Sequence, residues 1–359
     1  FGARFDARVA DATDMTATIA RDSLNGVILS NELPDVFSVH KVILSADGTA
    51  EVAFVVPIIP AGTWATVQPL LPATLVRAID EDDRAVEDRL FNGRRESAVY
   101  LTRASFVTLL EQLQSSRDYE SIANAVEFRE LYAPVSTVPI AAEHVRRYAE
   151  MYANVLARDP NGLVTYVNPG AERFIQDSAH VLRAGYVLTL DYGGNWEEML
   201  AQQTYPRLRT YGPAQRDEAN LAPNKIDTSA PYVGPTLNDL TTDVNFSLLA
   251  AQGASVGLRP VYYGAQRALQ AGTRVSLNRV PAERVREGNA DEFRSWVESF
   301  SGPSVYKMLL QQKSGTDPKY TFPGQSPESL DLGTAALTTE ERRRAEQIAQ
   351  RLKGLGGLR

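Results

Sequence analysis

Residues 26–35 read Gly-Val-Ile-Leu-Ser-Asn-Glu-Leu-Pro-Asp, an apolar run that ends abruptly in polar side chains. A short apolar run bounded by glycine and a polar cluster is typical of a strand buried in a parallel sheet. Its polar end would place Asn31, Glu32 and Asp35 at the carboxyl edge of that sheet, where open α/β sheets bind ligands. The alternative interpretation is that Asn31 and Asp35 cap the next helix and that Glu32 is solvated.

Further strand patterns lie on both sides of this run. We expect strands at residues 8–13, 51–56, 162–167 and 185–190, and a helix over residues 171–182. Strands that alternate with helices favour a mostly parallel sheet.

Residues 57–160 have a different pattern, with long charged and amphipathic stretches. Between Ile140 and Leu156, apolar side chains recur at helical spacing. The segment therefore predicts a mainly helical insertion or cap, long enough to form a lid or a dimer surface. Near the end of the chain, Thr338 and Glu341 form a capping box that predicts a helix as far as Lys353.

Composition excludes several kinds of chemistry. The 359 residues include 37 basic and 44 acidic side chains, three histidines and no cysteine. Without cysteine there are no disulfides, no thiolate catalysis and no cysteine-bound metal. A net charge of −7 without a basic patch argues against binding to nucleic acid or to an anionic membrane. Carboxylates, amides and hydroxyls must carry the chemistry.

Two other segments are candidates for a site. A predicted strand ends in Asp191 and Tyr192, followed by two glycines, which is also the pattern of a tight turn. Residues 238–246 are rich in Asn, Asp and Thr, and taken alone they indicate only the start of a helix.

The content and order of these segments resemble the MidA family of S-adenosylmethionine-dependent methyltransferases, which includes a mitochondrial complex I assembly arginine methyltransferase. Residues 31–35 match the family's Asn-Glu-Leu-x-Asp run, residues 191–193 its Asp-Tyr-Gly, and residues 239–246 its Asp-Ile-Thr-x-x-Val-Asp-Phe run. Looser matches occur at residues 263–266 and 306–308.

The sequence also departs from the family pattern. Asn245 stands where the family has an aspartate, and Pro34, Val36 and Ser38 differ from its usual residues. The family's glycine-rich cofactor loop has no match in the sequence. We expect that loop to lie before Phe1.

The resemblance implies a class I methyltransferase-like fold, which is a doubly wound, mostly parallel α/β sheet of about seven strands with a helical insertion. On this template, residues 1–56 are the N-terminal part of the core and residues 57–160 are the insertion. Residues 161–310 complete the core, and residues 311–359 form a loop and a C-terminal helix.

The resemblance also implies S-adenosylmethionine as cofactor, with S-adenosylhomocysteine as its product. No metal is expected, because the three histidines are not at helical ligand spacing and there is no cysteine. Asp11 and Ala12 would bind the adenine ring, and Asn31 and Glu32 would stand beside the methyl sulfonium. Asn31, Glu32 and Asp35 are the implied catalytic residues. Paired carboxylates suit a guanidinium, because that group stays protonated and its planar fork matches carboxylate geometry.

Four further residues are candidates for the acceptor side of the cleft: Asp191, Tyr192, Tyr211 and Tyr263. Tyrosine rings can stack on a flat cation. Half-buried packing is the alternative role for these tyrosines.

Two functional hypotheses remain open from the sequence. The first is a methyltransferase that acts on an arginine or guanidine nitrogen of a protein or peptide, or on a small molecule of specialised metabolism. The second is a catalytically inactive relative that acts as an assembly or scaffold protein, which the missing glycine loop favours. Alanine is abundant and arginine greatly outnumbers lysine, which is compatible with a GC-rich bacterial genome. We therefore expect a bacterial protein, located in the cytoplasm. Whether it forms a homodimer stays open.

Overall fold

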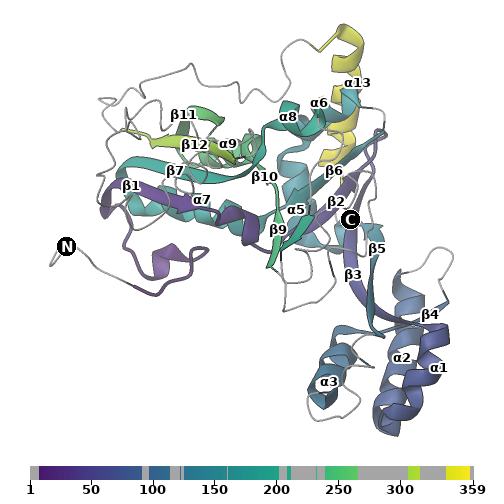
Figure 1. Ribbon diagram of the computed structural model, residues 1–359. Coiled ribbons are helices and arrows are strands. Elements are labelled where there is room, and N and C mark those ends of the chain that lie inside the picture. The colour runs from purple at the N-terminus through teal and green to yellow at the C-terminus, as the bar shows by residue number, and fades with distance from the viewer. Residues whose placement is uncertain are drawn as a thin grey trace, which may run out of the picture.

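The computed structural model describes residues 8–90, 97–113, 122, 125–159, 161–201, 208–211, 232, 239–265, 306–315 and 337–355. These residues form a mixed α/β fold with two five-stranded sheets and one two-stranded sheet (Figure 1). The first large sheet contains the strands that end near Asn31 and Asp191, and the second extends into a helical arm.

The first sheet has the strand order β1 (Leu24–Asn31), β7 (Leu182–Gly194), β12 (Tyr306–Lys313) and β11 (Leu258–Ala265). β1 runs parallel to β7, whereas β12 is antiparallel to both β7 and β11. β11 therefore runs in the same direction as β7. The short strand β10 (Val244–Asn245) pairs in parallel with the end of β7.

Helices α7 (Pro169–Val181) and α9 (Phe246–Ser255) cover one face of this sheet (Figure 1). Phe174 and Leu249 of these helices share a hydrophobic core with Val187 of β7. The short helix η2 (Met15–Ala17) packs against α7. The strand predicted at residues 8–13 is wrong, because residues 8–14 form coil and a turn.

The second sheet has the order β4 (Ala98–Tyr100), β3 (Ala50–Pro60), β2 (His40–Leu44) and β6 (Leu163–Val167), and β5 (Glu127–Pro134) also pairs with β3. All these pairings are antiparallel. The expectation of one seven-stranded, mostly parallel sheet is therefore wrong for the described residues. The predicted strands at 51–56 and 162–167 exist, but they belong to this antiparallel sheet.

The tight turn between β2 and β3 accounts for the antiparallel pairing of these two strands. Ser45 and Thr49 close this turn with a backbone hydrogen bond of 2.9 Å, and Gly48 adopts φ +85°. Strands joined by so short a connection must be antiparallel, since a parallel crossover needs a dozen residues or more.

Three helices complete this part of the fold: α5 (Pro139–Arg147), α6 (Ala149–Arg158) and α13 (Thr339–Lys353). The helix predicted over 140–156 is interrupted at Tyr148, whose φ and ψ are −105° and 22°. The capping box of Thr338 and Glu341 is confirmed at the start of α13, which packs on α6.

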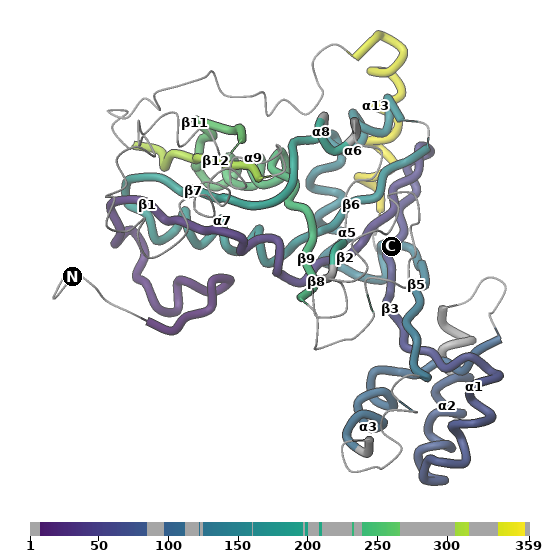
Figure 2. Tube along the Cα trace, in the orientation of Figure 1, coloured from purple at the N-terminus to yellow at the C-terminus, as the bar shows by residue number. Residues whose placement is uncertain are grey.

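β3 and β5 extend away from the rest of the molecule and lead to a helical arm (Figure 2). The arm contains α1 (Ala61–Val67), η4 (Gln68–Leu70), α2 (Ala73–Leu90) and α3 (Arg103–Leu113). Trp64, Ile79 and Leu109 belong to a separate hydrophobic core there. The remaining short elements are η3 (Pro34–Val36), η5 (Val135–Thr137), α8 (Trp196–Ala201) and the two strands of the small sheet, β8 (Leu208–Tyr211) and β9 (Asp239–Thr242).

The substitution Gly193→Ala tests how closely β10 packs against β7. The φ of Gly193 is +140°, and a Cβ built there would lie 2.0 Å from the carbonyl oxygen of Val244. We expect Gly193→Ala to destabilise the protein by about 1–3 kcal/mol through overpacking. The matched control is Gly62→Ala in α1, where a Cβ meets nothing within 4 Å. Thermal unfolding measures both, and equal stability of the two variants would contradict this packing.

Candidate functional site

The candidate site lies where β1 and β7 reach their carboxyl ends. β1 ends at Asn31, and Glu32 then adopts φ +49°, a conformation that non-glycine residues rarely take. The Glu32 amide donates to the carbonyl of Leu190 at 2.9 Å, so this strained residue is fixed against β7. Strain of this kind is found preferentially at functional sites.

Two aspartates meet beyond Glu32. Asp35 in η3 is 2% exposed and Asp191 near the end of β7 is 1% exposed. The amide of Asp35 donates to Asp191 Oδ2 at 3.2 Å, and the amide of Tyr192 donates to Asp191 Oδ1 at 2.7 Å. Within the described ranges, Asp35 Oδ1 is buried without a hydrogen-bond partner. A buried oxygen of this kind costs free energy until a donor reaches it.

The surroundings raise the pKa of both carboxyl groups. Burial, with a further contribution from the nearby Glu32 charge, raises the pKa of Asp35 to about 6. Burial and the neighbouring Asp35 charge raise the pKa of Asp191 to about 8. Because the two groups interact, their protons belong to the pair. At neutral pH the pair therefore holds about one proton.

A cation lies close to this acidic pair. Arg209 of β8 forms an ion pair with the buried Asp243, and its guanidinium lies 5.1 Å from the centre of the Tyr192 ring. The positive charge of Arg209 acts to lower the pKa of Asp35, but burial has the larger effect. Thr242 of β9 donates to the Asp35 carbonyl at 3.4 Å. The β8–β9 pair thus lies against the turn that carries Asp35.

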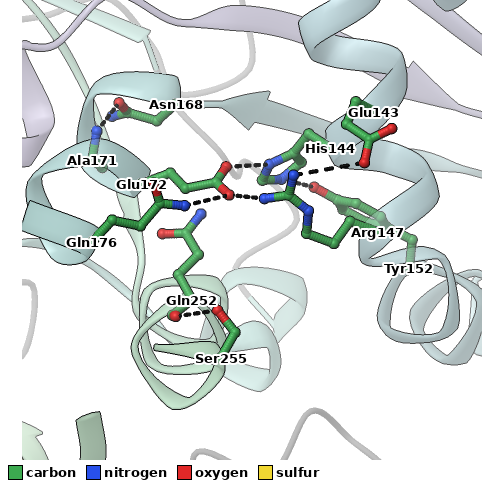
Figure 3. Close-up of polar contacts among 10 residues, drawn as sticks. All are labelled: Glu143, His144, Arg147, Tyr152, Asn168, Ala171, Glu172, Gln176, Gln252 and Ser255. Carbon is green, nitrogen blue, oxygen red and sulfur yellow. Dashed lines mark hydrogen bonds and ion pairs between the residues drawn. The ribbon is translucent and has the colours of Figure 1, made fainter. Parts of the chain in front are cut away.

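A small cavity of mixed polar and apolar lining includes Asn168 and Thr242, which bond to the turn that carries Asp35. It encloses about 30 Å³, enough for one or two waters, and six of its lining residues are His144, Asn168, Thr242, Asp243, Asn245 and Gln252. Figure 3 shows how α5 and α7 meet beside it: Glu172 faces His144 and Arg147. His144 Nε2 also lies 3.1 Å from the Tyr152 hydroxyl.

The structure brings together part of the predicted site. Glu32, Asp35 and Asp191 form one acidic group, as the pKa effects among them show. Asn31 lies beside them, with its Nδ2 3.4 Å from Glu32 Oε1. Tyr192 contacts the Arg209 cation, and its hydroxyl bonds to that of Tyr306.

Three other predicted residues do not join this acidic group. Tyr263 is fully buried, and its hydroxyl donates to Glu198 at 2.5 Å, which is the packing role considered for it. Asp11 is exposed and accepts from the amide and hydroxyl of Thr13, so it closes a turn. Ala12 packs against the core beneath α7. The side chain of Tyr211 is outside the described residues.

Sequence reasoning missed Arg209, Asp243 and Asn168 as parts of the site. Asp243 lies in the segment that was interpreted, taken alone, as the start of a helix. Arg209 lies two residues before Tyr211, and only the tyrosine was considered for binding. Nothing in the local pattern indicates that Arg209 pairs with Asp243 or that Asn168 reaches η3. Nor does any group of three His, Asp or Glu side chains in the described part of the chain have the arrangement to hold a metal ion.

Sheet topology and site geometry define an α/β protein with a buried group of acidic side chains at the carboxyl ends of its parallel strands. Residues 9–264 match the model of a family described as "Putative S-adenosyl-L-methionine-dependent methyltransferase". Because the match spans well over half of the sequence, the chain belongs to this family. A comparison with curated proteins finds no match.

Two solved structures from Burkholderia thailandensis, both of one superfamily, are similar to this chain. One of them is bound to S-adenosylhomocysteine and is 16% identical to this chain. The match covers 82% of this chain and 56% of that structure's chain, with a TM-score of 0.43. The other is a native structure with 16% identity, 82% and 57% coverage, and a TM-score of 0.44. This chain thus spans little more than half the length of either. No helix in the described ranges is long and apolar enough to cross a membrane.

Asp191→Asn tests the raised pKa of the carboxyl pair. The folded protein holds the Asp191 proton up to a pKa of about 8, whereas the unfolded chain releases it near the ordinary aspartate pKa of 3.8. Stability therefore falls as the pH rises from about 4 to about 8. The asparagine variant lacks this loss, so we expect its unfolding temperature, relative to the wild type, to be higher at pH 8.5 than at pH 5.5. A difference that does not vary with pH would contradict the raised pKa.

Proposed function

We propose that this chain takes part in S-adenosylmethionine-dependent methyl transfer to a guanidine nitrogen, either of an arginine in a protein or peptide or of a small molecule. The family membership supports the reaction class. The observation that carries the choice of acceptor is the buried pair of Asp35 and Asp191, with Asp35 Oδ1 unpartnered among the described residues.

Charge favours a cationic acceptor at this pair. Glu32 raises the pKa of both aspartates, so the three carboxyl groups repel one another. Arg209 is nearby, but it is already paired with Asp243. A second cation would relieve this repulsion and donate to the free oxygen of Asp35. A guanidinium fits better than an ammonium because its fixed fork can bond to two carboxylate oxygens at once.

The end of β1 offers groups that fit the cofactor. Asn31 and Glu32 are exposed polar residues beside the buried aspartates, at the sheet edge where α/β proteins bind ligands. In the proposal they hold S-adenosylmethionine, which supplies a methyl group already activated on a sulfonium. Asp11 and Ala12 stay in the proposal as adenine contacts, with Asp11 acting through Oδ2, because Thr13 bonds to Oδ1.

The proposed mechanism needs positioning, exclusion of water and one proton acceptor. Asp35 and Asp191 orient the guanidinium in a buried site, where the nitrogen can be aligned for in-line displacement. As the N–C bond forms and the C–S bond breaks, a proton must leave the acceptor nitrogen. Asp35 Oδ1 can accept it, since a pKa of about 6 allows proton uptake and later release to water.

Glu32→Gln tests the role of the acidic group. We expect a loss of at least about tenfold in methyl transfer to an arginine peptide, because the variant removes one charge that attracts and orients the cation. Radioactive transfer from labelled S-adenosylmethionine measures the rate. The matched control is Glu346→Gln, an exposed glutamate on α13.

Unchanged turnover in Glu32→Gln would show that the carboxylate has no such role. A folded wild-type protein that transfers no methyl group would favour the scaffold hypothesis.

A further inference from the structure

Asn168 connects the start of α7 to the turn that carries Asp35. Its Oδ1 accepts from the Ala171 amide at 2.8 Å, which caps α7 (Figure 3). Its Nδ2 donates to the Pro34 carbonyl at 2.7 Å. A carbonyl can only accept and an amide N–H can only donate, so these two contacts fix the orientation of the Asn168 side chain.

The Pro34 carbonyl and the Asp35 amide belong to one peptide group. Asn168 bonds to the carbonyl of this group, and Asp191 Oδ2 accepts from its N–H at 3.2 Å. In a trans peptide the C=O and N–H point in opposite directions. A donor that fixes the carbonyl therefore also aims the N–H, and it polarises that N–H toward the carboxylate.

We propose that Asn168 is a positioning residue, which holds the Pro34–Asp35 peptide so that its N–H meets Asp191 and the Asp35 carboxyl stays at the acceptor site. The role rests on the proposed function, because it prepares the carboxyl pair for an acceptor.

The first turns of α7 are also held by contacts that do not involve the Asn168 side chain. Glu172, one turn further along α7, lies against Arg147 and His144 of α5, as Figure 3 shows. Gln176 Nε2 lies 3.4 Å from the same carboxylate. The start of α7 is therefore fixed to α5 independently of Asn168, so a change at Asn168 can release the Asp35 turn without releasing the helix.

Two variants separate positioning from capping. Asn168→Ser and Asn168→Asp both keep a side-chain oxygen suited to cap α7, but neither keeps the amide donor. Serine adds no charge, whereas aspartate adds one. The control pair is Asn245→Ser and Asn245→Asp: Asn245 caps α9 by accepting from the Leu248 amide, and its Nδ2 has no hydrogen-bond partner among the described residues.

Amide NMR of the full chain provides the readout, without cofactor or acceptor. In both Asn168 variants we expect the Asp35 amide to exchange with solvent at least about tenfold faster. Its chemical shift should no longer follow the titration of Asp191. The Tyr192 amide, which donates to the other oxygen of Asp191, should still follow that titration. The Ala171 amide should stay protected, and the Asn245 variants should leave Asp35 unchanged.

Either of two results would overturn the role. The Asp35 amide could keep its protection and its titration in both Asn168 variants, in which case Asn168 does not aim it. Alternatively, Ala171 could lose protection together with Asp35 in both variants, in which case Asn168 only stabilises the helix. Because no methyl transfer is measured, failure of the proposed function would not alter either reading.

Discussion

The parallel pairing of β1 with β7 is the constraint on which the site depends. It places Asn31 opposite Leu190, so both strands end at the same edge and their following residues meet. β7 is also bound by β12 along its other side and by β10 at its end, and this makes it the best-supported strand of the sheet. Asp191 therefore has a fixed position, and the turn after β1 brings Asp35 to it.

Burying two neighbouring carboxyl groups costs folding free energy unless hydrogen bonds or a proton offset it. Here the backbone amides of Asp35 and Tyr192 bond to Asp191, and a proton shared at neutral pH removes one negative charge. The left-handed backbone of Glu32, and the Asp35 oxygen that has no hydrogen-bond partner among the described residues, add further cost. Groups that violate local rules in this way are expected where function requires them. A cationic ligand would satisfy the oxygen and the charge together.

Local sequence patterns predicted the strand at residues 26–30, its polar end and the capping box at Thr338 correctly. They failed where distant contacts decide. The strands at residues 51–56 and 162–167 were expected, but their antiparallel pairing depends on which strands lie beside them. Residues 8–13 had the pattern of a strand. Instead, the Asp11 carboxylate accepts a hydrogen bond from the Thr13 amide, and this closes a turn there. Asn168 reaches Pro34 across 134 residues, a contact that no local pattern shows.

Calorimetric titration of acetyl-arginine-amide into the full protein, with S-adenosylhomocysteine present, tests the central claim most directly. The buried pair should bind the guanidinium and lose its shared proton, so the heat of binding at pH 7 should change with the ionisation enthalpy of the buffer and show proton release. The citrulline analogue, which has the same shape without the charge, should bind far more weakly. Equal binding of the two, or arginine binding with no proton released, would contradict a carboxyl pair built for a cation.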